Sequence, residues 1–202
     1  MTSQNKNPGS FKISRTTCVL IAVFISIVGG AFAQDNRLGE TYVCTKGKTH
    51  FFASTPVEDI EATSNSSICV INTKTKKVSA KVLMTSCTFK SGLMQEHFNE
   101  NYMESGKYPY GVLDAVIVED IDFSKDGIYD ITLKGTFEIH GVKRDKEIKG
   151  KLTVKNGQPV GATAAFEVKL VDHDIKIPTA VLTKIAEVVK VDIDYKFEKY
   201  QK

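Results

Sequence analysis

Apolar and polar residues alternate along most of the chain after residue 40. In the two clearest segments, every second position on one face is apolar: Tyr129, Ile131, Leu133, Phe137 and Ile139 in the first, and Val189, Val191, Ile193, Tyr195 and Phe197 in the second. Successive side chains of a β-strand point to opposite faces of a sheet. This period of two therefore predicts strands that have one apolar face and one polar face.

Turn-forming dipeptides separate the alternating segments. Lys46-Gly47, Asp126-Gly127, His140-Gly141 and Asn156-Gly157 lie between them, and glycine at the second turn position is typical of tight hairpins. The sequence therefore predicts eight or nine strands in succession, joined mainly by hairpins. We expect an all-β fold, an eight-stranded antiparallel barrel, because closing a meander into a barrel removes its exposed edge strands.

A segment with a helical period interrupts the strands over 91–109. Each helical residue advances by about 100°, which places six side chains on the side that we expect to face the barrel: Leu93, Met94, His97, Phe98, Asn101 and Tyr102. Ser91 can cap the start of this helix, and Gly106 can supply a left-handed residue after its end. We expect the polar side chains of His97 and Asn101 either to bond backbone groups at the barrel rim or to meet the polar head of a ligand.

A second helix is expected over 178–189. Pro178 stands near its N-terminus, where the missing N–H group of proline costs little. With two short helices and many strands, the chain is expected to form one barrel domain.

The first 33 residues have the pattern of a cleavable signal peptide. Basic residues precede an apolar run over 18–28, and Ala31-Phe32-Ala33 supplies small residues where a signal peptidase cleaves. The apolar run is shorter than the about 20 residues that a membrane-spanning helix needs. We therefore expect cleavage after Ala33 and export of residues 34–202 as a periplasmic or secreted domain.

Removing this leader changes the charge of the chain. The full sequence has 27 basic and 24 acidic residues. Lys6, Lys12 and Arg15 account for the difference, and no acidic residue precedes residue 34. The remaining domain is near neutral with mixed signs, which gives no electrostatic footprint for nucleic acid.

Three cysteines remain after the predicted cleavage: Cys44, Cys69 and Cys87. An oxidising compartment permits one disulfide among them, and the odd number leaves at least one thiol unpaired in the monomer. Their spacing matches neither a CxxC redox pair nor a zinc ribbon. We interpret at least one of them as a small buried apolar residue, and the sequence leaves their pairing and the oligomeric state open.

Four motifs occur in an order that is typical of one known family. They are "FFASTPVEDIEATSN", "LMQEHFNENYMESGKYP", "GTFEIHGVKR" and "DHDIKIPTAV". From about residue 42 to the C-terminus, the chain resembles the YceI-like family of secreted lipid-binding proteins. The resemblance implies a lipocalin-like, extended antiparallel barrel whose apolar interior holds a polyisoprenoid chain.

The candidate ligand-binding residues combine the apolar faces of the strands with the first helix. They are Met94, His97, Phe98, Asn101, Tyr102, Leu133, Phe137, Ile139, Phe166, Val168, Val191, Ile193 and Tyr195. The function that the resemblance implies is an exported protein that carries or sequesters an isoprenoid-type lipid, with transient contact to a membrane or another lipid donor. No cofactor, metal, nucleic acid or catalytic residue is expected.

Two other hypotheses stay open. The chain could be an enzyme that uses the same cavity, with His97 or His140 as acid or base and Asp172 or Asp174 as its partner; this requires such a histidine within hydrogen-bonding distance of a carboxylate inside a cavity. Alternatively, the barrel is filled by its own side chains and works through its surface, since the interior of an eight-stranded barrel can be filled or can hold one small ligand. For His140-Gly141 we favour a simple hairpin over a catalytic base.

Overall fold

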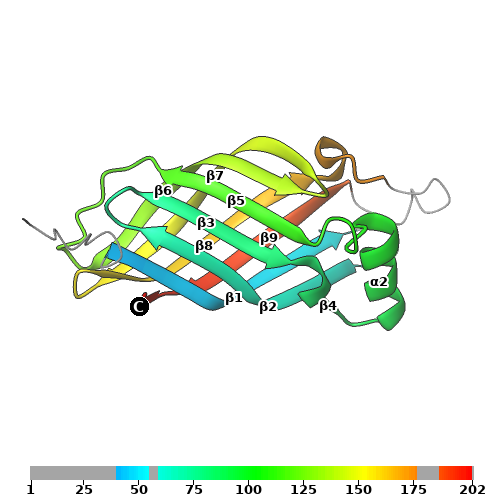
Figure 1. Ribbon diagram of the computed structural model, residues 1–202, viewed down its shortest axis with the longest axis horizontal. Coiled ribbons are helices and arrows are strands. Elements are labelled where there is room, and N and C mark those ends of the chain that lie inside the picture. Colours follow the sequence, from blue (N-terminus) through cyan, green and yellow to red (C-terminus); the bar gives the residue numbers. More distant parts are fainter. Residues whose placement is uncertain (1–39, 55–58, 177–186, 202) are drawn as a thin grey trace, which may run out of the picture. The chain divides into compact units, whose positions relative to one another are not determined.

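The computed structural model describes residues 40–54, 59–176 and 187–201, and these residues form a β-barrel (Figure 1). The predicted signal peptide over 1–33 lies outside the described residues, as do residues 178–186 of the predicted second helix. The end of that predicted helix is wrong, because Val188 and Val189 begin a strand. Val189 already belongs to the alternating pattern that continues to Phe197.

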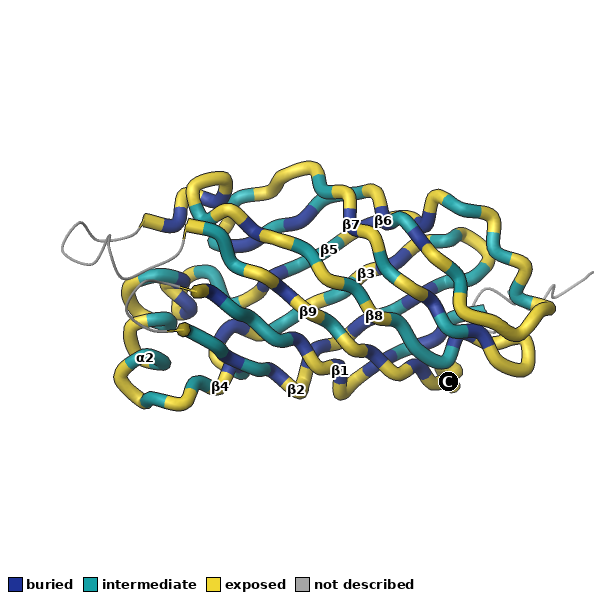
Figure 2. The backbone as a smooth tube through the Cα atoms, turned by 180° about the vertical axis from the view of Figure 1, so that it is seen from behind, coloured by how far each residue is buried: buried dark blue, intermediate teal, exposed yellow. Residues whose placement is uncertain are grey.

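Ten strands are described, and eight of them are long. Their bounds are β1 Thr41–Ser54, β2 Asp59–Asn72, β3 Lys77–Leu83, β4 Thr88–Phe89, β5 Tyr110–Ile117, β6 Gly127–Ile139, β7 Val142–Lys155, β8 Gln158–Lys169, β9 Val188–Lys196 and β10 Glu198–Lys199. Buried and exposed residues alternate along the long strands (Figure 2). The period of two in the sequence therefore corresponds to an inner and an outer barrel face.

The eight long strands close into an antiparallel barrel. Their order is β1-β9-β8-β7-β6-β5-β3-β2, and β2 pairs with β1 to complete the ring. The two-residue strands β4 and β10 add to β2 and β1, respectively. The predicted eight-stranded antiparallel barrel is confirmed.

Two of the expected hairpins have the backbone that their dipeptides predict, whereas the turn expected at Lys46-Gly47 is wrong, because both residues lie inside β1. His140 and Gly141 have φ angles of 54° and 73° and connect Ile139 directly to its partner Val142. Asn156 and Gly157, with φ angles of 52° and 74°, connect β7 to β8 in the same way. Positive φ at both central residues matches the right-handed twist of paired strands, so both turns fix the strand register.

A helical segment follows β4 at one end of the barrel (Figure 1). It consists of the α-helix α2, Gly92–His97, and the π-helical turn η3, Phe98–Tyr102. Ser91 caps it, since its side chain accepts a hydrogen bond from the backbone N–H of Met94. The prediction for Gly106 is wrong: Glu104 has the positive φ, 44°. The π turn ends the helical segment at Tyr102, and the turn that follows begins at Glu104, whose carbonyl accepts from the N–H groups of Lys107 and Tyr108.

The interior contains two clusters of buried apolar side chains. The strand-lined core consists of Tyr42, Cys44, Cys69, Ile71, Val78, Ala115, Ile117, Ile131, Leu133, Ile148, Leu152, Tyr195 and Phe197. The helix-end core consists of Met84, Met103, Phe137, Ile139, Val168, Ile175 and Val191. The second includes residues from outside the long strands, such as Met84 in the 3-10 turn η2, Met84–Ser86.

Candidate functional site

Two adjacent apolar cavities lie between and beside these cores. The inner lobe has a volume of about 60 Å³, and the outer lobe has a volume of about 100 Å³. Five side chains line both lobes and form the wall between them: Phe51, Met84, Phe137, Ile139 and Val191. The candidate site is therefore one apolar interior with two lobes that share these five residues.

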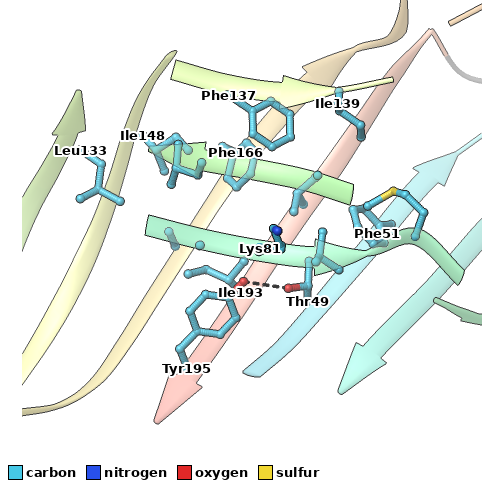
Figure 3. A pocket seen from close by; sticks show the side chains of 17 residues that line it. Thr49, Phe51, Lys81, Leu133, Phe137, Ile139, Ile148, Phe166, Ile193 and Tyr195 are labelled. Atoms are coloured by element: carbon cyan, nitrogen blue, oxygen red, sulfur yellow. Dashed lines mark hydrogen bonds between the residues drawn. The ribbon is translucent and has the colours of Figure 1, made fainter. Parts of the chain in front are cut away.

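The inner lobe is walled by the inward faces of the strands (Figure 3). Leu133 and Phe137 come from β6, and Ile193 and Tyr195 come from β9. The rings of Phe137 and Phe166 meet edge to face with their centroids 5.9 Å apart. Strand alternation alone is enough to aim these side chains into the lobe.

The outer lobe is closed by segments that connect the strands. Phe98 of η3, Met103 after it, and Leu170 of the 3-10 turn η4, Leu170–His173, all line this lobe. The Phe98 ring packs on that of Phe89 with a centroid distance of 4.9 Å. The interior is therefore bounded at this end partly by residues outside the eight long strands.

Nine of the thirteen candidate residues line one or both lobes. They are Phe98, Leu133, Phe137, Ile139, Phe166, Val168, Val191, Ile193 and Tyr195. Met94 and Tyr102 line neither lobe, although Tyr102 is half-buried against the helix-end core. His97 and Asn101 are exposed, so the prediction that they face the barrel is wrong.

The inner face of the helical segment is displaced from the predicted one. Its half-buried polar residues are Gln95 and Asn99, while Leu93 is 61% exposed. The Gln95 side chain accepts a hydrogen bond from the Phe89 backbone N–H, and the Asn99 side chain donates to the Gln95 carbonyl. Polar side chains of the helical segment thus bond to backbone groups at the barrel rim, as one of the two alternatives predicted. The residues that do so are Gln95 and Asn99, not His97 and Asn101.

Several lining residues were missed by the pattern in the sequence. Phe51 and Phe52 are adjacent in β1 and both line the outer lobe, so consecutive aromatics hide the period of two. Met84 and Met103 lie in a 3-10 turn and after a π turn, where neither strand nor helix periodicity applies. Thr49 is polar and nevertheless faces the inner lobe.

Three buried hydroxyl groups meet at the inner lobe. The Thr49 oxygen lies 2.8 Å from that of Ser67 and 3.0 Å from the Tyr195 hydroxyl (Figure 3 draws the second pair). Their exposed fractions are 3%, 0% and 5% for Thr49, Ser67 and Tyr195. Burial raises the pKa of the Tyr195 phenol, so this group stays protonated at neutral pH.

A histidine and carboxylate pair lies at the end of the β6–β7 hairpin. His140 Nε2 is 2.9 Å from Glu104 Oε2, and its Nδ1 is 3.2 Å from the His173 carbonyl oxygen. Neither residue lines either lobe. In the described part of the chain, the enzyme hypothesis therefore does not meet its requirement for a histidine and carboxylate inside the cavity.

Comparison with known proteins identifies the family. The model of the YceI-like domain matches residues 44–197. This chain belongs to the YceI-like domain family. A search of curated proteins returned no match.

Solved structures share the YceI-like fold at low sequence identity. A polyisoprenoid binding domain from Saccharophagus degradans, implicated in plant cell wall breakdown, is 13% identical, with 80% of this chain and 99% of that chain covered and a TM-score of 0.63. BcnA from Burkholderia cenocepacia is 11% identical, with coverages of 74% and 95% and a TM-score of 0.58. The YCEI protein of Campylobacter jejuni is 15% identical, with coverages of 68% and 81% and a TM-score of 0.50. At these identities the likeness concerns the fold alone.

The three cysteines of this YceI-like barrel are free and buried. Cys44 of β1 stands directly opposite Cys69 of β2 in the strand register. Burial raises the pKa of the Cys69 and Cys87 thiols to about 12. The interpretation of at least one cysteine as a buried apolar residue is confirmed.

Among residues 40–54, 59–176 and 187–201, no group of three or more His, Cys, Asp or Glu side chains could hold a metal ion. Within the same ranges, no helix is long and apolar enough to span a membrane.

Proposed function

We propose that this YceI-like barrel is an exported protein that carries or sequesters an isoprenoid-type lipid in its interior. The observation that carries the proposal is the pair of adjacent apolar lobes, lined almost entirely by aliphatic and aromatic side chains. Such a surface matches a branched hydrocarbon chain, because removing apolar groups from water is favourable. Burial of one apolar side chain contributes a free energy of roughly 1.5–3 kcal/mol. The fold shared with a polyisoprenoid binding domain from Saccharophagus degradans supports the isoprenoid class.

Loading a lipid requires the interior to expand. Lobes of about 60 and 100 Å³ are smaller than the roughly 300–1,000 Å³ of typical ligand pockets. Met84 lies in the wall between the lobes, and methionine adapts readily because its side chain is unbranched and flexible. In the proposed mechanism, an entering chain displaces Met84 and its neighbours and joins the two lobes.

Mass spectrometry of an organic extract tests the proposed function. The protein is purified without detergent from a host that exports it, and is then offered prenyl lipids in its folded state. A stoichiometric isoprenoid in either extract supports the proposal. Two clean extracts would overturn it and favour a barrel filled by its own side chains, a hypothesis to which the small lobe volumes already lend weight.

Two charged variants test the lining. Phe137→Asp places a carboxylate beside both lobes and Phe98→Asp places one in the outer lobe; burying a charge in an apolar site is costly, so each is expected to abolish lipid retention. Ile128→Asp is the matched control, because Ile128 is 69% exposed on β6. Retention that survives both charged changes in folded protein would overturn this lining.

Export is a separate part of the proposal. It rests on the basic, apolar and small-residue pattern of residues 1–33. N-terminal sequencing of protein collected outside the cytoplasm should begin at Gln34. Protein that keeps Met1 and stays in the cytoplasm would contradict export without affecting the binding proposal.

A further inference from the structure

The three buried hydroxyls at the inner lobe have one proton more than their mutual hydrogen bonds use. Thr49 lies between Ser67 and Tyr195 and bonds to both. Each hydroxyl donates one proton and accepts up to two, so two bonds consume two of the three protons. Ser67 also acts on the Tyr195 hydroxyl, but within the described residues only the two contacts of Thr49 have hydrogen-bond geometry, so one donor is left over.

This spare donor faces the cavity in most arrangements of the protons. Thr49 and Tyr195 line the inner lobe, whereas Ser67 does not. If Ser67 donates to Thr49, the free proton belongs to Thr49 or Tyr195, and both point toward the lobe (Figure 3). A buried donor without an acceptor costs about 1–3 kcal/mol, which a ligand oxygen in the lobe would recover.

The backbone of β1 is shaped to hold the Tyr195 ring at this position. The register between β1 and β2 shifts on both sides of Gly47, which stands opposite Ser67. A Cβ atom on Gly47 would lie 2.5 Å from the Tyr195 ring, closer than any van der Waals contact. The bulge and its glycine therefore let the ring lie against β1 with its hydroxyl next to Thr49.

The inner lobe offers no buried counter-charge for an anion. Among the described residues that line it, Lys81 is the only charged one, and it is exposed. Its ammonium group lies 4.2 Å from the centroid of the Tyr110 ring, which is itself exposed. A phosphate or carboxylate in the lobe would be buried without a partner, which is strongly unfavourable.

We propose that Thr49, Ser67 and Tyr195 form a subsite for an uncharged oxygen at one end of the lipid, a hydroxyl or a carbonyl. The oxygen lies in the inner lobe and accepts the spare proton, while the hydrocarbon chain extends through the Met84 wall into the outer lobe. This inference rests on the proposed lipid-binding function. It adds that the preferred ligand is a neutral oxygenated isoprenoid rather than a hydrocarbon or a prenyl phosphate.

The test compares three short probes that differ at one end: geraniol, the hydrocarbon that lacks only its hydroxyl oxygen, and geranyl phosphate. Dissociation constants are measured by displacement of a fluorescent apolar dye from the folded protein. Geraniol should bind about five- to tenfold more tightly than the hydrocarbon, the effect of one net hydrogen bond. Geranyl phosphate should bind most weakly.

Tyr195→Phe and Thr49→Val remove hydroxyls while keeping the shape of the lining. Combined in one double variant they should abolish the preference for geraniol over the hydrocarbon, because each single change leaves one hydroxyl of Thr49 or Tyr195 facing the lobe. Tyr129→Phe is the matched control, because the Tyr129 hydroxyl donates to the carbonyls of Asp122 and Lys125 outside the lobes. Thermal unfolding monitors folding. If the double variant does not fold, Ser67→Ala decides the test: it leaves the spare proton on Thr49 or Tyr195 in every arrangement, so it should keep the preference for geraniol, and loss of that preference would overturn the subsite.

The outcomes separate this inference from the proposed function. A preference for geraniol that persists in the folded double variant overturns the subsite and leaves lipid binding intact. Equal binding of geraniol and the hydrocarbon by the unmodified protein does the same. If none of the probes displaces the dye, both the subsite and the proposed function fail.

Discussion

The two ends of the barrel interior are built from different parts of the chain. The strand-lined core takes its side chains from the long strands and from Phe197 beyond β9, and includes Leu152, which is 1% exposed. The helix-end core depends on Met84, Met103 and Ile175, which lie in turns and connections. The larger lobe adjoins this second core.

The difference indicates where the interior opens. Strand residues are held by continuous ladders, such as the thirteen register pairs from Gly127↔Val154 to Ile139↔Val142. The helical segment follows the two-residue strand β4, and its Gln95 side chain accepts a hydrogen bond from the backbone N–H of Phe89 in that strand. Regions with fewer backbone hydrogen bonds to the rest of a protein open at lower free energy, so we expect ligand to enter at the helix end.

The largest expected difference between the two ends is in the free energy of unfolding that is lost when one buried side chain is truncated at each end. Leu152→Ala leaves a cavity in the strand-lined core and should lower the free energy of unfolding by about 3–5 kcal/mol. Met103→Ala should cost less than half as much, because the outer lobe already borders Met103 and fewer contacts are lost. Urea denaturation measures both, and equal costs would mean that the two ends are packed alike.

Strand alternation explains why the strand-built part of the site could be predicted from the sequence. Leu133, Phe137, Val191 and Ile193 follow a strict period of two, and each lines a lobe. The hairpin at His140-Gly141 was predictable for a similar reason, since few residues adopt positive φ. Local rules therefore specify the strand-lined end almost completely.

The helix end was predicted poorly because its geometry is set by tertiary packing. A period of 3.6 placed His97 and Asn101 inward, but the π turn at Phe98–Tyr102 and the hydrogen bonds of Gln95 and Asn99 select another face. Ser67 shows a similar limit at the strands. Its hydroxyl reaches that of Thr49 only because two shifts in the register between β1 and β2 bring the residues together. The alternation of apolar and polar residues does not predict such a shift.

The next effect concerns pH and compares Cys69 with Cys87. Burial raises both pKa values to about 12, whereas an unfolded thiol titrates near pH 8.5. Between pH 8 and pH 10 the unfolded chain ionises and the folded chain does not, so the free energy of unfolding should fall by about 2 kcal/mol for each thiol. The stabilisation is complete below pH 8 and disappears as pH rises toward 12.

Urea denaturation at the two pH values checks this fall, with Cys69→Ala and Cys87→Ala as variants that remove one thiol each. Each variant should reduce the pH-dependent fall in the free energy of unfolding by the contribution of the thiol that it removes. A smaller share for Cys87 would mean that the helix end opens enough for this thiol to ionise in the native state. A loss that neither variant reduces would assign the pH dependence to other groups.

Thiol labelling sharpens the same comparison under native conditions. Cys87 follows η2 at the helix end, whereas Cys44 and Cys69 lie in the strand-lined core. All three are almost fully buried, so labelling requires opening of the structure. Cys87 should react at least about tenfold faster, equivalent to an opening free energy lower by about 1.4 kcal/mol. Identical rates for the three cysteines would contradict a separately opening helix end.

The smallest effect is expected at the contact that fastens the helical segment to the β6–β7 hairpin. His140 faces oxygen atoms with both ring nitrogens, at Glu104 and at the His173 carbonyl, and its ring packs edge to face on Tyr108. In Glu104→Gln the amide still reaches His140, so the free energy of unfolding should change by less than about 1 kcal/mol.

The local effect of Glu104→Gln should nevertheless be measurable by hydrogen exchange. The Ser105 N–H, which donates to the Asn99 carbonyl, should exchange several-fold faster, while amides in the β6–β7 ladder keep their rates. Lys134→Gln, which removes an exposed ion pair with Glu147 on the barrel wall, is the matched control and should leave Ser105 unchanged. Faster exchange throughout β6 and β7 would instead mean that Glu104 stabilises the barrel strands themselves. The distinction between a fixed strand-lined end and an opening helix end would then fail at this contact.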